Sequence, residues 1–102
     1  MLAEFAIVPV GAGESLGDSI ASVLKLVDES GLPYRAGSMG TTVEGEWDAV
    51  MALIKRCHDA VMEKAPRVVS HISMDIRPSK PDDRLTEKLA SVERRLGKQL
   101  KA

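Results

Sequence analysis

Hydrophobic residues follow two different spacings along the chain, and the changes between them predict where strands and helices lie. A nearly continuous apolar run at residues 3–10 predicts a first strand, which Pro9 and Gly11 bring to an end. Apolar residues then recur every three or four positions between residues 16 and 27, which is the spacing of one helix face. We therefore expect a helix that ends near Ser30, with Gly31 as its C-terminal stop.

Two short extended runs follow at residues 34–38 and 41–46, and Gly40 lies at the corner between them. Glycine suits such a tight connection because its backbone is permissive, so the two runs predict a β-hairpin. A second helix is expected directly after Gly45, and Pro66 closes it. The apolar face of this helix comprises Trp47, Val50, Met51, Ile54, Cys57 and Val61.

Residues 67–77 alternate between apolar and polar, which predicts a long fourth strand with one polar face. After a turn at residues 78–81, a third helix is expected in which charged residues surround an apolar stripe. The stripe consists of Leu85, Leu89, Val92, Leu96 and Leu100. It is too narrow for a fully buried helix.

The predicted order of strand, helix, strand, strand, helix, strand is the split βαβ pattern of ferredoxin-like folds. We therefore predict a single α+β domain over residues 1–102, with an antiparallel sheet in the order 4-1-3-2 and an extra C-terminal helix. Right-handed crossovers place the two main helices on one sheet face and leave the other face uncovered by this chain. That face includes Glu4, Ala6, Val8, His71 and Ser73. A mixed apolar face of this kind predicts self-association, with the stripe of the third helix as a second contact.

The composition narrows the class of protein without changing the fold. The chain has 102 residues, of which 44% are hydrophobic and 28% charged, and its net charge is −1. These values exclude a disordered chain and give no basic charge for nucleic-acid binding, and the three aromatic residues are too few for an RNA-recognition sheet. The longest apolar run is too short to span a bilayer and has no signal-peptide features, so we expect a cytoplasmic protein without a membrane contact.

Catalytic and metal-binding patterns are absent from the sequence. His58 and His71 do not stand at metal-ligand spacing, and no serine lies in a nucleophile motif. The single cysteine, Cys57, allows no internal disulfide and falls in a helical pattern, which favours a small buried hydrophobe over a nucleophile. We therefore expect a protein that is not an enzyme and has no catalytic residues, metal site or cofactor.

The second arm of the predicted hairpin carries polar groups that a ligand could use. Thr41, Thr42 and Glu44 occupy positions where a purely structural strand more often carries Val or Ile, although Thr also suits strands and Glu44 can simply face water. Side chains alternate along a strand, so Thr42 and Glu44 share one face and Thr41 takes the other. All three can line one pocket only through a bulge or a second subunit.

Several segments together resemble one family, the small thiamine-binding proteins. The segments are Val8-Pro9-Val10-Gly11 with Ser15, residues 29–34, residues 38–48, Arg67-Val68, Asp75-Ile76-Arg77, and Lys88 through Ser91-Val92-Glu93. The most specific part is the Met-Gly-Thr…Glu-Gly sequence within residues 38–48. The family often has Ser-Val-Ser where this chain has Ser15-Leu16-Gly17, so the second serine of that motif is missing here.

The resemblance implies a ferredoxin-like subunit that assembles into dimers or tetramers and binds thiamine or its hydroxymethylpyrimidine part without catalysis. The first two strands are expected to run parallel, which brings the loop at residues 11–15 and the corner at residues 38–42 to the same end of the sheet. Hydroxyl groups suit the nitrogens of a pyrimidine, and a carboxylate suits a thiazolium cation. The predicted ligand-binding residues are Ser15, Ser38, Met39, Thr41, Thr42 and Glu44.

An alternative function of a different class fits the same residues. The chain would then be a regulatory or scaffolding homo-oligomer whose polar hairpin contacts a protein partner instead of a metabolite. Fold alone does not separate the two, because one fold serves many functions.

Overall fold

The protein is described by a computed structural model that covers residues 1–11, 16–78 and 84–100. Its elements in chain order are β1 (Leu2–Val10), α1 (Leu16–Glu29), β2 (Tyr34–Ala36), β3 (Thr41–Glu44), α2 (Trp47–Met62), β4 (Arg67–Asp75) and α3 (Arg84–Leu96). The predicted order of strand, helix, strand, strand, helix, strand with an extra C-terminal helix is therefore confirmed, as is the α+β class.

The four strands of the described chain form one antiparallel sheet in the order β2-β3-β1-β4. This is the predicted order 4-1-3-2 read from the opposite edge. The central strand, β1, pairs Phe5 with Thr41 of β3 on one side and with Ile72 of β4 on the other. Because β1 and β2 are both antiparallel to β3, they run in the same direction, as expected.

Three strands are shorter at their C-terminal ends than the alternation predicted, each for a local reason. β2 stops at Ala36 because the chain turns at once, with Gly37 N donating to Gly40 O over 2.9 Å. β3 stops at Glu44, since Glu46 already serves as the N-cap residue of α2. β4 stops at Asp75, which pairs with the first residue of β1, so that the chain beyond it has no strand to pair with.

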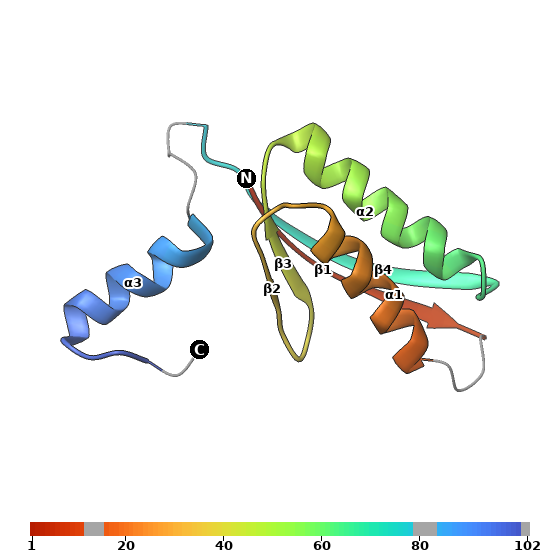
Figure 1. Ribbon diagram of the computed structural model, residues 1–102, viewed down its shortest axis with the longest axis horizontal. Coiled ribbons are helices and arrows are strands. Elements are labelled where there is room, and N and C mark those ends of the chain that lie inside the picture. The colour runs from red at the N-terminus through yellow and green to blue at the C-terminus, as the bar shows by residue number, and fades with distance from the viewer. Residues whose placement is uncertain (12–15, 79–83, 101–102) are drawn as a thin grey trace.

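The two helices α1 and α2 cover one face of the sheet, and the hydrophobic core lies between the two layers (Figure 1). Alternate residues of the central strands, Ala3, Phe5 and Val43, point into this core and are buried. Val27 of α1 and Val50 of α2 meet them from the helix layer. Each such side chain contributes about 1.5–3 kcal/mol to stability when fully buried.

Trp47 departs from the face assigned to it by helical spacing. The sequence placed it on the buried face of α2, but its side chain is 53% exposed, so that assignment was wrong. The space at this end of the helix is already filled, because the side chains of Leu32 and Val50 close over Gly45. Trp47, as the first residue of α2, therefore lies outside the core.

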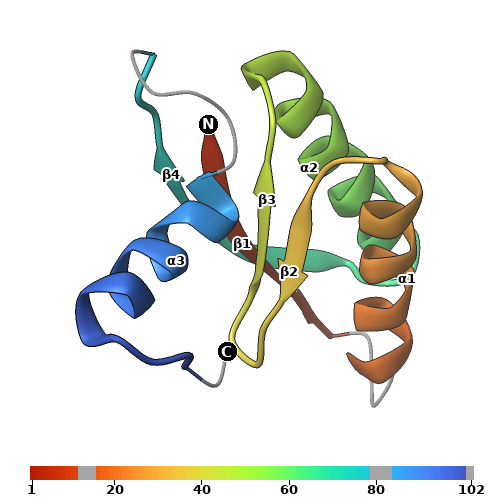
Figure 2. The same cartoon turned by 60° about the vertical axis from the view of Figure 1, so that its left-hand side comes forward.

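The third helix lies on the opposite side of the sheet from α1 and α2 and projects away from it (Figure 2). Its described contact with the sheet is made mainly with β3. Leu85 and Leu89 are half-buried, whereas Val92 and Leu96 further along the same stripe are exposed. The expected narrow stripe is therefore present, and much of it faces outward.

Candidate functional site

The strand β3 sends the predicted ligand-binding residues to opposite faces of the sheet. Thr41 pairs with Phe5 and faces the helix layer, whereas Thr42 pairs with Glu4 and Arg35 and faces the other side. Glu44 lies on the same side as Thr42. The alternation predicted this division, and no bulge within β3 removes it.

A cavity of about 240 Å³ lies on the helix side, enclosed by α1, β1 and the hairpin formed by β2 and β3. Both views place the N-terminal end of α1 and the tip of the hairpin at the same end of the molecule (Figures 1 and 2). The residues that line the cavity are Phe5, Ala6, Ile7, Val8, Leu16, Ile20, Val23, Leu24 and residues 36–41.

Three of the six predicted residues meet at this cavity, namely Ser38, Met39 and Thr41. Ser38 and Met39 belong to the exposed tip, and the Met39 side chain is 90% exposed. Thr42 and Glu44 lie on the other sheet face and do not line the cavity, so the six residues do not form one site within the described chain. Ser15 lies outside the described residues.

Thr41 supplies the polar group that is best placed inside the cavity. Its side chain is 8% exposed and faces the core side of the sheet between Phe5 and Ala36. Within the described ranges, its hydroxyl group forms no hydrogen bond with the protein. No fully buried side-chain oxygen of the described residues lacks a hydrogen-bond partner, so this hydroxyl is reached by solvent through the cavity. It is therefore open to a ligand that donates to it or accepts from it.

Gly40 is needed at the hairpin for a different reason from the one predicted. Its backbone does not adopt a positive φ, since the positive-φ glycines of the described chain are Gly11, Gly31 and Gly97. Instead, a Cβ at Gly40 would lie only 3.1 Å from the carbonyl oxygen of Phe5. The glycine therefore allows the end of the hairpin to approach β1 closely, which positions Thr41 against Phe5.

Glu44 is buried, and it contacts α3. Its side chain is 3% exposed, which corrects the interpretation that it faces water. The Oε1 atom accepts a hydrogen bond from the backbone nitrogen of Leu85 over 3.4 Å. A carboxylate near the first turn of a helix is stabilised by the helix dipole. The structure thus gives this carboxylate a role in anchoring α3.

The apolar wall of the cavity was not recognised from the sequence. Helical spacing placed Leu16 and Ile20 on the core face of α1, but both are about half exposed and line the cavity instead. Ser19 lies between them in the sequence and is buried. The polar Ser19, at helical spacing among apolar residues, was a sequence signal that this part of the face is not ordinary core. Spacing alone does not show, however, where a helix extends beyond the sheet that it packs against.

The ionisable groups that most resemble catalytic residues have structural contacts. His58 of α2 bonds through Nδ1 to the carbonyl oxygen of Ile54 over 2.8 Å, and its Nε2 bonds to the hydroxyl of Ser70 in β4. This arrangement ties α2 to β4, away from the cavity lining. Cys57 is buried, and desolvation raises the pKa of its thiol to about 11, which disfavours the thiolate.

Two further kinds of site are absent from the described ranges, a metal centre and a membrane span. No group of three or more His, Cys, Asp or Glu side chains there is placed to hold a metal ion. No helix in this part of the chain has the length and apolar character required to cross a bilayer.

Comparison with known proteins identifies the family of this chain. The family model for thiamine-binding proteins matches residues 3–93. A UPF0045 protein of Mycobacterium bovis is 40% identical over 97 residues, covering 94% of each chain. One of Synechocystis is 37% identical over 94 residues, covering 91% of this chain and 77% of its own.

Solved structures share the fold. A hypothetical protein of Methanocaldococcus jannaschii superposes with a TM-score of 0.79 at 28% identity, covering 89% of this chain and 93% of its own. A Thermotoga maritima protein, provisionally named a thiamine biosynthesis/salvage protein, superposes with a TM-score of 0.76. It is 23% identical and covers 89% of this chain and 96% of its own, a likeness that supports the fold alone.

Proposed function

Since the chain belongs to the thiamine-binding protein family, we propose that it is a non-catalytic binding protein for thiamine or its hydroxymethylpyrimidine part. The observation that carries the proposal is the apolar cavity with the solvent-accessible hydroxyl of Thr41 on its wall. In this proposal the pyrimidine ring occupies the cavity, and Ser38 and Met39 at the hairpin tip lie beside it.

The size and lining of the cavity support a ligand of one ring. Pockets for drug-sized ligands have volumes of roughly 300–1,000 Å³, so a cavity of about 240 Å³ suits a smaller molecule. Aliphatic side chains from β1 and α1 match the two faces of a flat ring. Thr41 offers both a donor and an acceptor for a ring nitrogen or an amino group.

Non-catalytic binding is proposed because the groups nearest to catalytic chemistry are engaged elsewhere. The thiol of Cys57 is buried and protonated at neutral pH, and both nitrogens of His58 are bonded to Ile54 and Ser70. Neither Cys57 nor His58 lines the cavity. A cytoplasmic location and assembly into dimers or tetramers belong to the same proposal, and the exposed part of the α3 stripe supports the assembly.

Calorimetric titration with thiamine and with hydroxymethylpyrimidine tests the function. We expect saturable binding that the variant Thr41→Val weakens by about three- to tenfold, because one net hydrogen bond contributes about 1 kcal/mol. Thr42→Val is the matched control, since it removes the same hydroxyl from the opposite sheet face. Absence of heat and of any thermal shift at millimolar ligand would refute the assignment.

One observation favours the alternative of a protein partner. Met39 stands at the hairpin tip with 90% of its side chain exposed, and flexible methionines are common on protein-binding surfaces. Under this alternative, Met39→Ser abolishes capture of one stoichiometric protein while thiamine compounds give no binding. Under the binding-protein function, the same variant retains most of the ligand affinity.

A further inference from the structure

The described lining of the cavity contains no charged side chain. Its walls are aliphatic apart from Phe5, and its polar side chains are Ser38 at the exposed tip and Thr41 inside. Moving a charged group into such surroundings is costly unless an opposite charge or several hydrogen bonds compensate it. The cavity therefore selects against charge.

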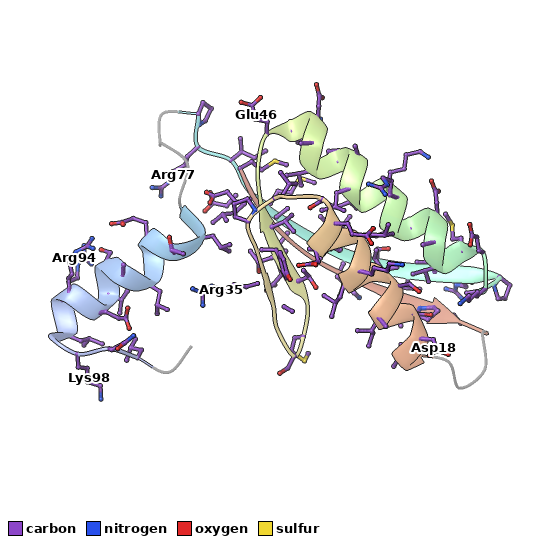
Figure 3. All side chains as sticks on the ribbon, in the orientation of Figure 1. Asp18, Arg35, Glu46, Arg77, Arg94 and Lys98 are labelled. Atoms are coloured by element: carbon purple, nitrogen blue, oxygen red, sulfur yellow. The ribbon has the colours of Figure 1, made fainter. Side chains whose placement is uncertain are left out.

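The charged side chains on the neighbouring elements are directed elsewhere. Arg35 projects from β2 toward the side of α3 and away from α1, and Asp18 lies on the side of α1 away from the hairpin (Figure 3). Glu44 lies on the other sheet face, where it contacts Leu85. Glu4, next to Phe5 in the sequence, pairs with Thr42 on that same far face, and none of these groups lines the cavity.

A single hydroxyl within the cavity also limits which features of a ligand the cavity distinguishes. Recognition of a particular heterocycle requires several placed donors and acceptors, because each unmatched buried group then penalises the wrong ring. Here Thr41 is the one polar side chain held within the described wall, and apart from Ser38 at the exposed tip the other lining side chains are apolar and give contacts without direction. The lining therefore distinguishes charge and size more strongly than ring type.

We propose that this cavity binds uncharged single-ring compounds that carry one hydroxyl or amino group as a class, whether or not they derive from thiamine. The ring contacts the aliphatic wall, and its polar substituent pairs with the hydroxyl of Thr41. This proposal rests on the proposed function in one respect, since both place the ligand in the same cavity. It extends the ligand class to neutral aromatic alcohols and amines.

Three probes of nearly equal shape test the selection against charge. Benzyl alcohol is neutral, whereas benzoate is an anion and benzylammonium is a cation at neutral pH. Titration followed by NMR shifts at the cavity residues should show binding of benzyl alcohol and at least about tenfold weaker binding of both ions, because neither charge finds a partner. Equal affinity for either ion would overturn the proposal.

Two variants connect the binding to this cavity. Thr41→Val should weaken benzyl alcohol several-fold and leave toluene, which has no hydroxyl, nearly unchanged, while Thr42→Val should affect neither. Ala36→Leu places a larger side chain at an exposed position of the cavity wall and should abolish binding of both probes without disturbing the core. If Thr42→Val acted as strongly as Thr41→Val, the assignment to this cavity would be wrong.

The outcomes separate this proposal from the proposed function. Binding of benzyl alcohol without binding of any thiamine compound supports the broad neutral class and overturns the thiamine function. Binding of thiamine compounds without binding of benzyl alcohol supports the thiamine function and overturns the broad neutral class. If neither series binds, both proposals are overturned.

Discussion

Glu44 Oε1 lies 3.4 Å from the backbone nitrogen of Leu85, so a buried carboxylate of β3 accepts a hydrogen bond from the first turn of α3. The two residues are 41 positions apart in the sequence. The contact joins the projecting helix to the sheet on the face that α1 and α2 leave uncovered (Figure 2). The polar side chains of β3 therefore have two different roles. Thr41 lines the cavity on one sheet face, and Glu44 holds α3 on the other.

Removal of the Glu44 carboxylate should release α3. We expect Glu44→Ala to lower the free energy of unfolding by about 1–3 kcal/mol, because it leaves the backbone donor of Leu85 without this partner. Urea denaturation and proteolysis within α3 measure the effect. Glu4→Ala removes an exposed carboxylate from the same sheet face and should change stability by no more than about 0.5 kcal/mol. Equal effects of the two variants would contradict the anchoring role.

The close approach at Gly40 predicts a contrast between two glycines. Gly40→Ala should destabilise the fold by about 1–3 kcal/mol, because the new methyl group would lie 3.1 Å from the carbonyl oxygen of Phe5. Gly17→Ala adds the same group in α1 with nothing within 4 Å, and it should stabilise the helix by about 0.5 kcal/mol. Thermal unfolding of both variants checks the sign, and a neutral Gly40→Ala would show that the hairpin can shift without cost.

The raised pKa of the Cys57 thiol predicts a loss of stability in alkali. Burial raises this pKa from 9.0 to about 11, so between these values the unfolded thiol ionises while the folded thiol keeps its proton. The unfolded state then binds fewer protons, and stability falls as the pH rises from 9.0 to about 11, with no contribution from this group below that range. Urea midpoints across this pH range measure the fall.

The matched variant Cys57→Ala should lose that part of the pH dependence, although it will be less stable overall because it leaves a small void. A thiol reagent at pH 8 should modify the native protein slowly and the urea-unfolded protein quickly, since thiolate and access are both lacking in the fold. Rapid modification of the native protein would contradict the burial of Cys57.

The exposed end of the α3 stripe predicts a change in assembly. Leu96 is 58% exposed, and we expect Leu96→Asp to reduce the oligomeric mass by light scattering while circular dichroism stays native, because a charge would be buried unpaired at the contact. Arg95→Asp is the control, since it introduces the same charge one position away from the stripe and near the same helix end. A wild-type mass of one subunit at micromolar concentration would contradict this prediction.

The order of the elements, the strand order and the division between Thr41 and Thr42 were all predictable from the sequence. They follow from local rules, since side chains alternate along a strand, helix faces repeat every three to four residues, and crossovers have one hand. The buried state of Cys57 and the stop at Gly31, whose φ is 78°, follow from the same rules. Each depends on neighbours in the chain or on the topology alone.

Only the tertiary structure decided the burial of Glu44, the exposure of Trp47 and Leu16, and the reason for Gly40. For Glu44 and Gly40 the deciding atoms come from segments distant in sequence, namely the backbone nitrogen of Leu85 and the carbonyl oxygen of Phe5. The cavity has the same origin, because its volume is the space that α1 and the hairpin leave between them. Periodicity identifies the face of an element, whereas the distance to the opposing element is set by how all the side chains pack together.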